Sequence, residues 1–198
     1  MKILCLIPAL LFFNLFTHAQ TKFDSALHKK LVMMRTEDQK WRIEIYKLSQ
    51  HQNSDYDEVT IEKNMARADS INIIDVKAIF RKYGYPSYAL VGKVGSSCFW
   101  TIVQHCDDDV NFQQNVLVAM DKEVRRHNAS GENYAYLKDR VLVNQGHKQL
   151  YGTQLKLNPK THLYEALPME NPANVDTRRK AVGLSPLSDY LKQNNPSN

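Results

Sequence analysis

The sequence predicts a mainly α-helical single domain, a bundle of five or six helices with a small β-hairpin near the C-terminus. Before Gly146, apolar residues recur at alternating steps of three and four, which is the period of an amphipathic helix. After Gly146, two short runs flank the turn-forming residues Asn158–Lys160, a pattern typical of a hairpin. The alternative is an α+β fold in which Tyr88–Val91, a short extended stretch, adds a third strand.

The first three helices are expected before Gly84. A stripe of apolar residues predicts a long helix over Phe23–Leu48, followed by a polar loop. A second helix is expected over Glu58–Ser70. Asn72 is a candidate cap for a third, Ile73–Tyr83, which Gly84 would end.

Three more helices are expected in the middle of the chain. Gly95 to His105 is apolar nearly all round, so it predicts a buried helix. Asp109 is the expected cap of a helix that runs to Arg126, and Glu132–Gln145 is the sixth.

The C-terminal part changes in character. Gln149–Leu157 and Leu163–Leu167 are the expected strands of the hairpin. Asp176–Val182 and Ser188–Gln193 are expected to form short helices. Residues 194–198 are expected to be a disordered tail.

The composition is that of an ordinary folded protein. The 198 residues are 43% hydrophobic and 24% charged, which excludes wholesale disorder. Seven Gly and seven Pro exclude collagen-like and low-complexity chains. The length fits one domain. Such a chain folds without disulfides or a structural metal, because it buries roughly 70% of its unfolded surface.

The N-terminus has the pattern of a signal peptide over residues 1–19. Lys2 precedes an apolar run, Ile3–Phe16, and the small-residue site Thr17–Ala19 follows. The run is too short to cross a bilayer, which takes about 20 residues. We therefore expect export to the periplasm or the medium, a globular domain over residues 20–193, and no integral membrane segment after cleavage.

The charge and the cysteines indicate which partners and which covalent links to expect. Cleavage removes Lys2, so the mature charge is 25 − 21 = +4, and the basic residues are scattered rather than arranged in a stripe. This argues against nucleic acid as a partner. Cys98 and Cys106, if they share one helix, lie about 12 Å apart, beyond the reach of a disulfide. Buried free thiols are the expectation.

Polar residues interrupt the apolar pattern at inward positions of the expected helices or lie on the first expected strand. They are Asp38, Arg42, Gln104, His105, Asp107, Gln113, Asp139, Arg140, Gln149, Tyr151 and Gln154. Buried polar groups need partners, so this set is either a structural network or the lining of a site.

If the set is a site, His105 is the candidate general acid or base, oriented by Asp107 or Asp139. Arg42 or Arg140 is the candidate to hold an anionic group. The remaining members are candidate ligand-binding residues: Asp38, Gln104, Gln113, Gln149, Tyr151 and Gln154. Glutamine suits a small polar ligand or a peptide, because its amide both donates and accepts.

Sharp enzyme motifs are absent from the sequence. It has no Gly-rich phosphate loop, no Gly-x-Ser-x-Gly elbow and no His-Glu-x-x-His. With one plausible His, neither a metal site nor a cofactor is expected. Three hypotheses stay open: a hydrolase-like exported enzyme, a non-catalytic binding module for a polar or anionic ligand, and a purely structural polar network.

The ordered motifs resemble a family of uncharacterised, often exported bacterial proteins, known as a domain of unknown function. The matching pieces are Asp38-Gln39 with Arg42, Tyr83–Ser87, Gln104-His105 with Asp107, Phe112-Gln113, Ala135–Leu137 with Asp139-Arg140, Gln149 with Tyr151–Gln154, Asp176, Arg178-Arg179 and Gly183-Leu184. The sequence departs from the pattern at Tyr85 and Cys106. The resemblance implies a grouping and a candidate site, and no established activity.

Overall fold

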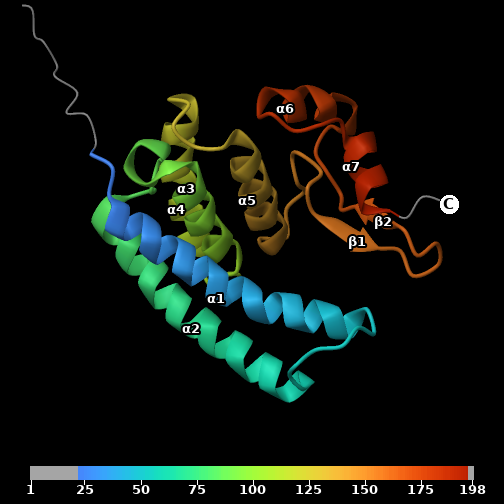
Figure 1. Cartoon of the computed structure of the whole chain (residues 1–198). Coiled ribbons are helices and arrows are strands. Elements are labelled where there is room, and N and C mark those ends of the chain that lie inside the picture. The colour runs from blue at the N-terminus through green and yellow to red at the C-terminus, as the bar shows by residue number, and fades with distance from the viewer. Residues whose placement is uncertain (1–21, 196–198) are drawn as a thin grey trace, which may run out of the picture.

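Five long helices form a bundle, and a two-stranded hairpin with short helices follows them, in a computed structural model that describes residues 22–195 (Figure 1). The long helices are α1 (Ser25–Ser49), α2 (Glu58–Tyr83), α3 (Tyr88–Gln104), α4 (Val110–Arg125) and α5 (Gly131–Asn144). The predicted fold class is confirmed. The expected signal peptide and the tail residues 196–198 lie outside the described residues.

Side-chain caps begin four of the five long helices. In each, the capping oxygen accepts the backbone N–H three residues further on, at 2.8 to 3.1 Å. The capping residues are Asp24, Asp57, Asp109 and Ser130. The expectation that Asp109 caps the helix reaching Arg125 is thereby confirmed.

α2 is one continuous helix, so the expected break at Asn72 is wrong. Asn72 lies in its middle and is buried. The apolar face continues past it, from Ala68 to Val76, and packing of that face outweighs the local preference of Asn for a cap. The helix ends at Gly84, whose φ of 67° favours glycine.

Tyr88–Val91 is helical, which overturns the expected extended stretch and the α+β alternative. These residues form the first turn of α3, where the N–H of Tyr88 donates to the carbonyl of Asn128 at 2.9 Å. Gly92, with φ 72° and ψ 171°, then kinks the helix. A single helical turn before a kink has no periodicity that a sequence pattern can register.

α3 runs through the centre of the bundle, as its all-round apolar sequence predicts. Phe99 and Val103 are fully buried, and Cys98 and Cys106 are buried free thiols, as expected. The main core gathers side chains from all five long helices. None of the helices within residues 22–195 is both long and apolar enough to cross a membrane.

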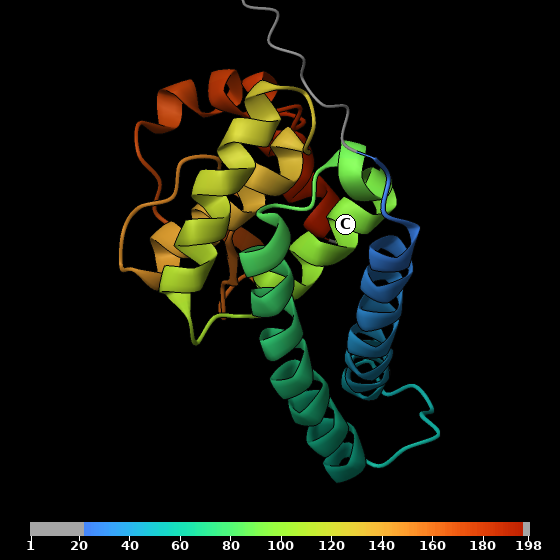
Figure 2. The ribbon, with the colours of Figure 1, turned by 90° about the vertical axis from the view of Figure 1, so that its left-hand side faces the viewer.

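α1 and α2 form a hairpin that extends beyond the rest of the molecule (Figure 2). Its outer half has a small hydrophobic cluster of its own, separate from the main core. We call this the outer cluster; it contains Trp41, Ile61 and Ala68, with Ile45, Leu48, Tyr56 and Met65 against them.

The C-terminal hairpin is shorter than expected. β1 (Leu155–Leu157) pairs antiparallel with β2 (Tyr164–Ala166). Gly152, at φ 72°, breaks the first expected strand. Before it, Gln149 forms an isolated parallel bridge with Met169, and the N–H of Leu150 donates to Asp139 of α5. A 3-10 turn at Pro172–Asn174 leads into α6.

Two short helices close the chain as expected, α6 (Val175–Ala181) and α7 (Leu187–Asn194). The sequence assigns Asn194 and Asn195 to the tail. In the structure Asn194 ends α7, and the side chain of Asn195 bonds to both backbone groups of Tyr164, at 2.6 and 3.1 Å.

Candidate functional site

A polar layer crosses the α1–α2 hairpin between the main core and the outer cluster. On α1 the layer begins at Asp38, a polar residue in the otherwise apolar buried face of the helix. Met34 of the main core precedes it, and Trp41 of the outer cluster follows it. On α2 it contains Asp69 and Asn72. Because it separates two apolar clusters, the layer is enclosed by packed side chains above and below.

Asp38 is the centre of this layer, with a side chain only 1% exposed. Its carboxylate accepts from Gln39 Nε2 at 2.7 Å and from Arg42 Nε at 3.4 Å. His105 Nδ1 lies 2.9 Å away. Burial alone would raise the pKa of Asp38, but the bonds from His105 and Gln39 and the charge of Arg42 hold it below the ordinary value.

Arg42 joins the two helices of the hairpin. Its Nη2 donates to Asp69 Oδ1 at 2.6 Å, while Nε faces Asp38, and Nη1 lies 3.7 Å from Met65 Sδ. The guanidinium is therefore fixed by carboxylates on both α1 and α2.

Asp38, Asp69 and His105 offer ligand atoms within 4.8 Å of one another, a grouping that is also found around divalent metals. Here the Arg42 guanidinium donates to both carboxylates. The cluster is accordingly an ion-pair network whose cation comes from the chain itself.

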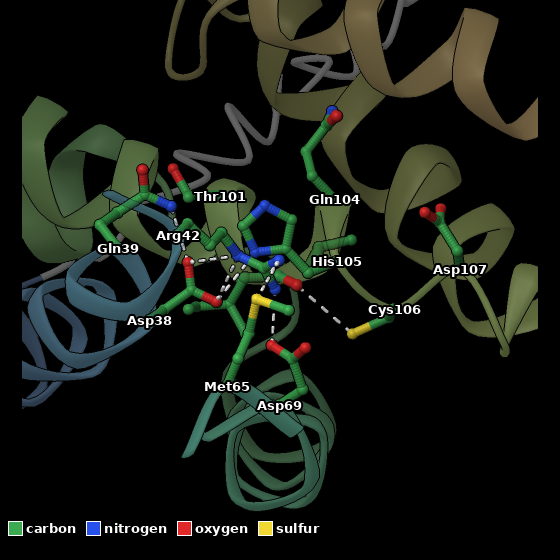
Figure 3. A network of polar contacts seen from close by, with 12 residues as sticks. Asp38, Gln39, Arg42, Met65, Asp69, Thr101, Gln104, His105, Cys106 and Asp107 are labelled. Atoms are coloured by element: carbon green, nitrogen blue, oxygen red, sulfur yellow. Dashed lines mark hydrogen bonds and ion pairs between the residues drawn. The ribbon is translucent and has the colours of Figure 1, made fainter. Parts of the chain in front are cut away.

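His105 reaches Asp38 because α3 ends there. Gln104 is the last helical residue and His105 is the cap. Figure 3 shows the ring with one edge on Asp38 and the other edge turned away. The side chain is 21% exposed, and Nε2 has no hydrogen-bond partner within residues 22–195. An ionised Asp38 accepts from Nδ1–H, so the neutral ring keeps its lone pair on Nε2.

The expected partners of His105, Asp107 and Asp139, lie elsewhere. Asp107 accepts two bonds from Arg140, at 2.9 and 3.0 Å, one from Asn144 and one from Gln113. Burial would raise its pKa, but Arg140 holds that pKa below the ordinary value. This second cluster fastens the end of α3 to α4 and α5.

Asp139 is fully buried in a backbone cradle. Its carboxylate accepts the N–H groups of Leu150, Tyr151 and Thr153 at 2.7 to 3.1 Å. The Thr153 hydroxyl adds a bond at 3.0 Å. Arg140, the neighbour of Asp139 along the chain, pairs with Asp107 instead. Asp139 holds the loop after α5 in place.

Gln149, Tyr151 and Gln154 belong to the same loop. Gln149 is fully buried and bonds Gln154 and Leu167 backbone groups with both ends of its amide, at 2.8 to 3.0 Å. The carbonyl of Tyr151 accepts from the buried Arg179 at 2.7 Å. These residues therefore connect the loop to the hairpin and to α6.

Gln104 and Gln113 have buried amides that are only partly satisfied. Gln113 Nε2 donates to Val103 O at 3.0 Å and to Asp107 Oδ1 at 3.1 Å. Within residues 22–195, Gln113 Oε1 and Gln104 Nε2 have no hydrogen-bond partner. Figure 3 shows Gln104 pointing away from the Asp38–His105 pair.

Ten of the eleven expected residues thus fall into three clusters rather than one, and the side chain of Gln104 joins none of them. Only Asp38, Arg42 and His105 meet, and Gln104 neighbours His105 along the chain without facing it. Several side-chain partners lay outside the predicted set, among them Gln39, Asp69, Asn144, Thr153 and Arg179. For Asp69 a signal exists, because it stands on α2 where the apolar face changes from the outer cluster to the core.

No curated protein and no solved structure matches the chain. One family model does, and it spans residues 25–196, which is nearly all of the described chain. It includes Asp38, His105 and the loop held by Asp139. The chain therefore belongs to a family of unknown function, DUF6624.

Proposed function

We propose that this protein is a hydrolase in which His105 is the general base and Asp38 orients it. The observation that carries the proposal is the asymmetry of the pair. The carboxylate is buried and held by three side chains, whereas the imidazole is partly exposed and has a free Nε2 among the described residues. A general base needs this arrangement, with one nitrogen fixed and the other open.

The reaction follows from that geometry. A water molecule at Nε2 gives a proton to the ring as its oxygen attacks the acyl or phosphoryl centre of the substrate. As the bond to the leaving group breaks, the ring returns that proton to the leaving oxygen or nitrogen. Asp38 keeps Nδ1–H in place throughout and stabilises the imidazolium, as a buried carboxylate does in other His-dependent hydrolases.

Arg42 and Asp69 are positioning residues in this proposal. Arg42 holds Asp38, and Asp69 on α2 holds Arg42, at 2.6 Å. The signal-peptide pattern of residues 1–19 adds that the enzyme acts after export. Asp107 and Asp139 have no part in the chemistry, because their oxygens are bonded to other groups.

The test is turnover of p-nitrophenyl esters and p-nitrophenyl phosphate by the purified chain. His105→Gln should lower kcat/KM by about 10² to 10⁴-fold, the usual contribution of a general base. His147→Gln, at an exposed histidine, is the matched control for background hydrolysis by imidazole.

Free imidazole should restore part of the activity of His105→Ala, which a merely structural role would not allow. Wild-type turnover by a folded His105→Gln protein would overturn the proposal. Tight binding of a ligand without turnover would leave the protein a binding module.

A further inference from the structure

A groove of about 460 Å³ is lined by residues of α1 and α3, among them Gln39, the chain neighbour of Asp38. Its volume lies within the range of about 300 to 1,000 Å³ that is typical of small-molecule sites. The floor is apolar and is formed by Val32, Ile43, Val94 and Cys98. Ile43 and Val94 are more than half exposed, so the apolar surface is open to solvent.

The rim of the groove is cationic. Arg35 and Lys40 line it, and both side chains are exposed. Neither makes an ion pair with an acid of residues 22–195; Lys40 Nζ lies over the Trp41 ring, 4.3 Å from its centroid. Two cations that form no salt bridge within residues 22–195, beside an apolar floor, are complementary to an anion that carries an apolar group.

Both walls of the groove continue along the chain toward the Asp38–His105 pair. On α3, Val94, Cys98, Thr101 and His105 follow at steps of four, three and four, so they share one face of the helix. On α1, Gln39 lines the groove and donates to Asp38 at 2.7 Å. His105 does not itself line the groove, but a molecule that extends from Cys98 past Thr101 along this face of α3 would approach the imidazole.

We propose that this groove binds the substrate, and that the substrate is an anionic amphiphile: an apolar chain with one carboxylate or phosphate group and a hydrolysable bond. The apolar chain lies along Val32 and Val94, the anion pairs with Arg35 and Lys40, and the bond to be cleaved reaches His105. The cleavage rests on the proposed function, whereas binding to the groove does not.

Isothermal titration calorimetry with four probes tests the binding: decanoate and decyl phosphate below their micelle concentrations, decanol, and acetate. We expect decanoate and decyl phosphate to bind at least tenfold more tightly than decanol, and acetate not to bind. The double variant Arg35→Gln/Lys40→Gln should weaken decanoate binding at least tenfold. The control Lys29→Gln/Lys63→Gln removes the same charge from exposed sites outside the groove and should leave binding unchanged.

Val94→Asp gives a second variant. Val94 is 57% exposed, so we expect the variant to fold, and it should abolish binding. Equal affinity for decanol and decanoate, or equal weakening by both double variants, overturns the proposal. So does a failure of every probe to bind the wild-type chain, and so does binding only to vesicles of anionic phospholipid.

The same variants separate this proposal from the proposed function. His105→Gln should bind decanoate as the wild type does while it loses ester turnover. Binding with the expected charge dependence but without turnover of any ester would overturn the hydrolase and keep the groove. Turnover that depends on His105 but has the same KM in Arg35→Gln/Lys40→Gln would overturn the groove and keep the hydrolase.

Discussion

The carboxylate of Asp139 on α5 accepts both the backbone N–H and the side-chain hydroxyl of Thr153, at 2.9 and 3.0 Å, although the two residues are 14 positions apart. Two further backbone N–H groups converge on the same carboxylate. A fully buried acid thus fixes a segment that the sequence predicts to be part of a strand.

Asp139→Asn should therefore destabilise the fold by about 3 kcal/mol, because the new amide N–H₂ group turns a donor toward backbone donors. Thr153→Val removes one bond of the set and should cost about 1 kcal/mol. Urea unfolding measures both. Asp121→Asn, which breaks an exposed ion pair with Arg125, is the control and should cost under about 0.5 kcal/mol.

The lowered pKa of Asp38 predicts loss of stability in acid. Since the folded-state pKa lies below the ordinary value of 3.8, the charged form stabilises the fold above roughly pH 4. This contribution disappears as the pH falls through the folded-state pKa. Asp38→Asn should lower the free energy of unfolding at pH 7 by about 2 kcal/mol. It should also reduce the loss of melting temperature that the wild type shows as the pH is lowered below about 4. If the melting temperature of Asp38→Asn fell in acid as steeply as that of the wild type, the lowered pKa of Asp38 would be contradicted.

We expect that replacing Asn72 by an apolar residue stabilises the fold. Its Nδ2 is buried without a hydrogen-bond partner in the described chain, in the middle of α2. Asn72→Leu keeps the side-chain size, removes the unpaired amide and favours the helix, so it should raise the free energy of unfolding by about 1 kcal/mol. Ser70→Leu, on the exposed face, should change it by less than about 0.5 kcal/mol. Urea unfolding of both variants decides the matter; a destabilised Asn72→Leu protein would show that the amide has a partner.

At Arg179 we expect that lysine cannot replace arginine without a loss of stability. The guanidinium is 1% exposed, donates to the carbonyls of Ser185 and Tyr151 at 2.6 and 2.7 Å, and lies over the Tyr190 ring. A single ammonium cannot reach both carbonyls, so Arg179→Lys should cost about 2 kcal/mol. Lys180→Ala, at the exposed neighbour, should be nearly neutral. Thermal unfolding of the two variants gives the comparison.

The helices could be predicted from the sequence because apolar periodicity is a local property. α1, α4 and α5 begin and end within one or two residues of the expected positions. The errors came where packing outweighed local preference. Asn72 favours a cap in isolation but continues α2 in the bundle, and the turn Tyr88–Val91 is helical because Asn128 anchors it from another element.

The partners of the site residues could be predicted only in part. Asp38 and His105 each stood out as polar residues in an apolar stripe, but they are 67 positions apart. Sequence reasoning offered Asp107 or Asp139 as the acid that orients His105. The actual pairing follows from the packing of α1 against α3, which no local pattern contains. Two polar interruptions, one on each of two apolar helices, are the signal that would have joined them.

The polar layer also divides the α1–α2 hairpin into two units of different stability. The outer cluster is small and protrudes, so opening of the hairpin tip exposes less apolar surface than global unfolding. Such an opening removes Arg42 and Asp69 from Asp38 while the main core stays folded. Amide hydrogen exchange should therefore be faster in the outer half of the hairpin than in α3. The fraction of molecules with an ordered Asp38–His105 pair is then set by this local equilibrium and not by the melting point of the whole domain.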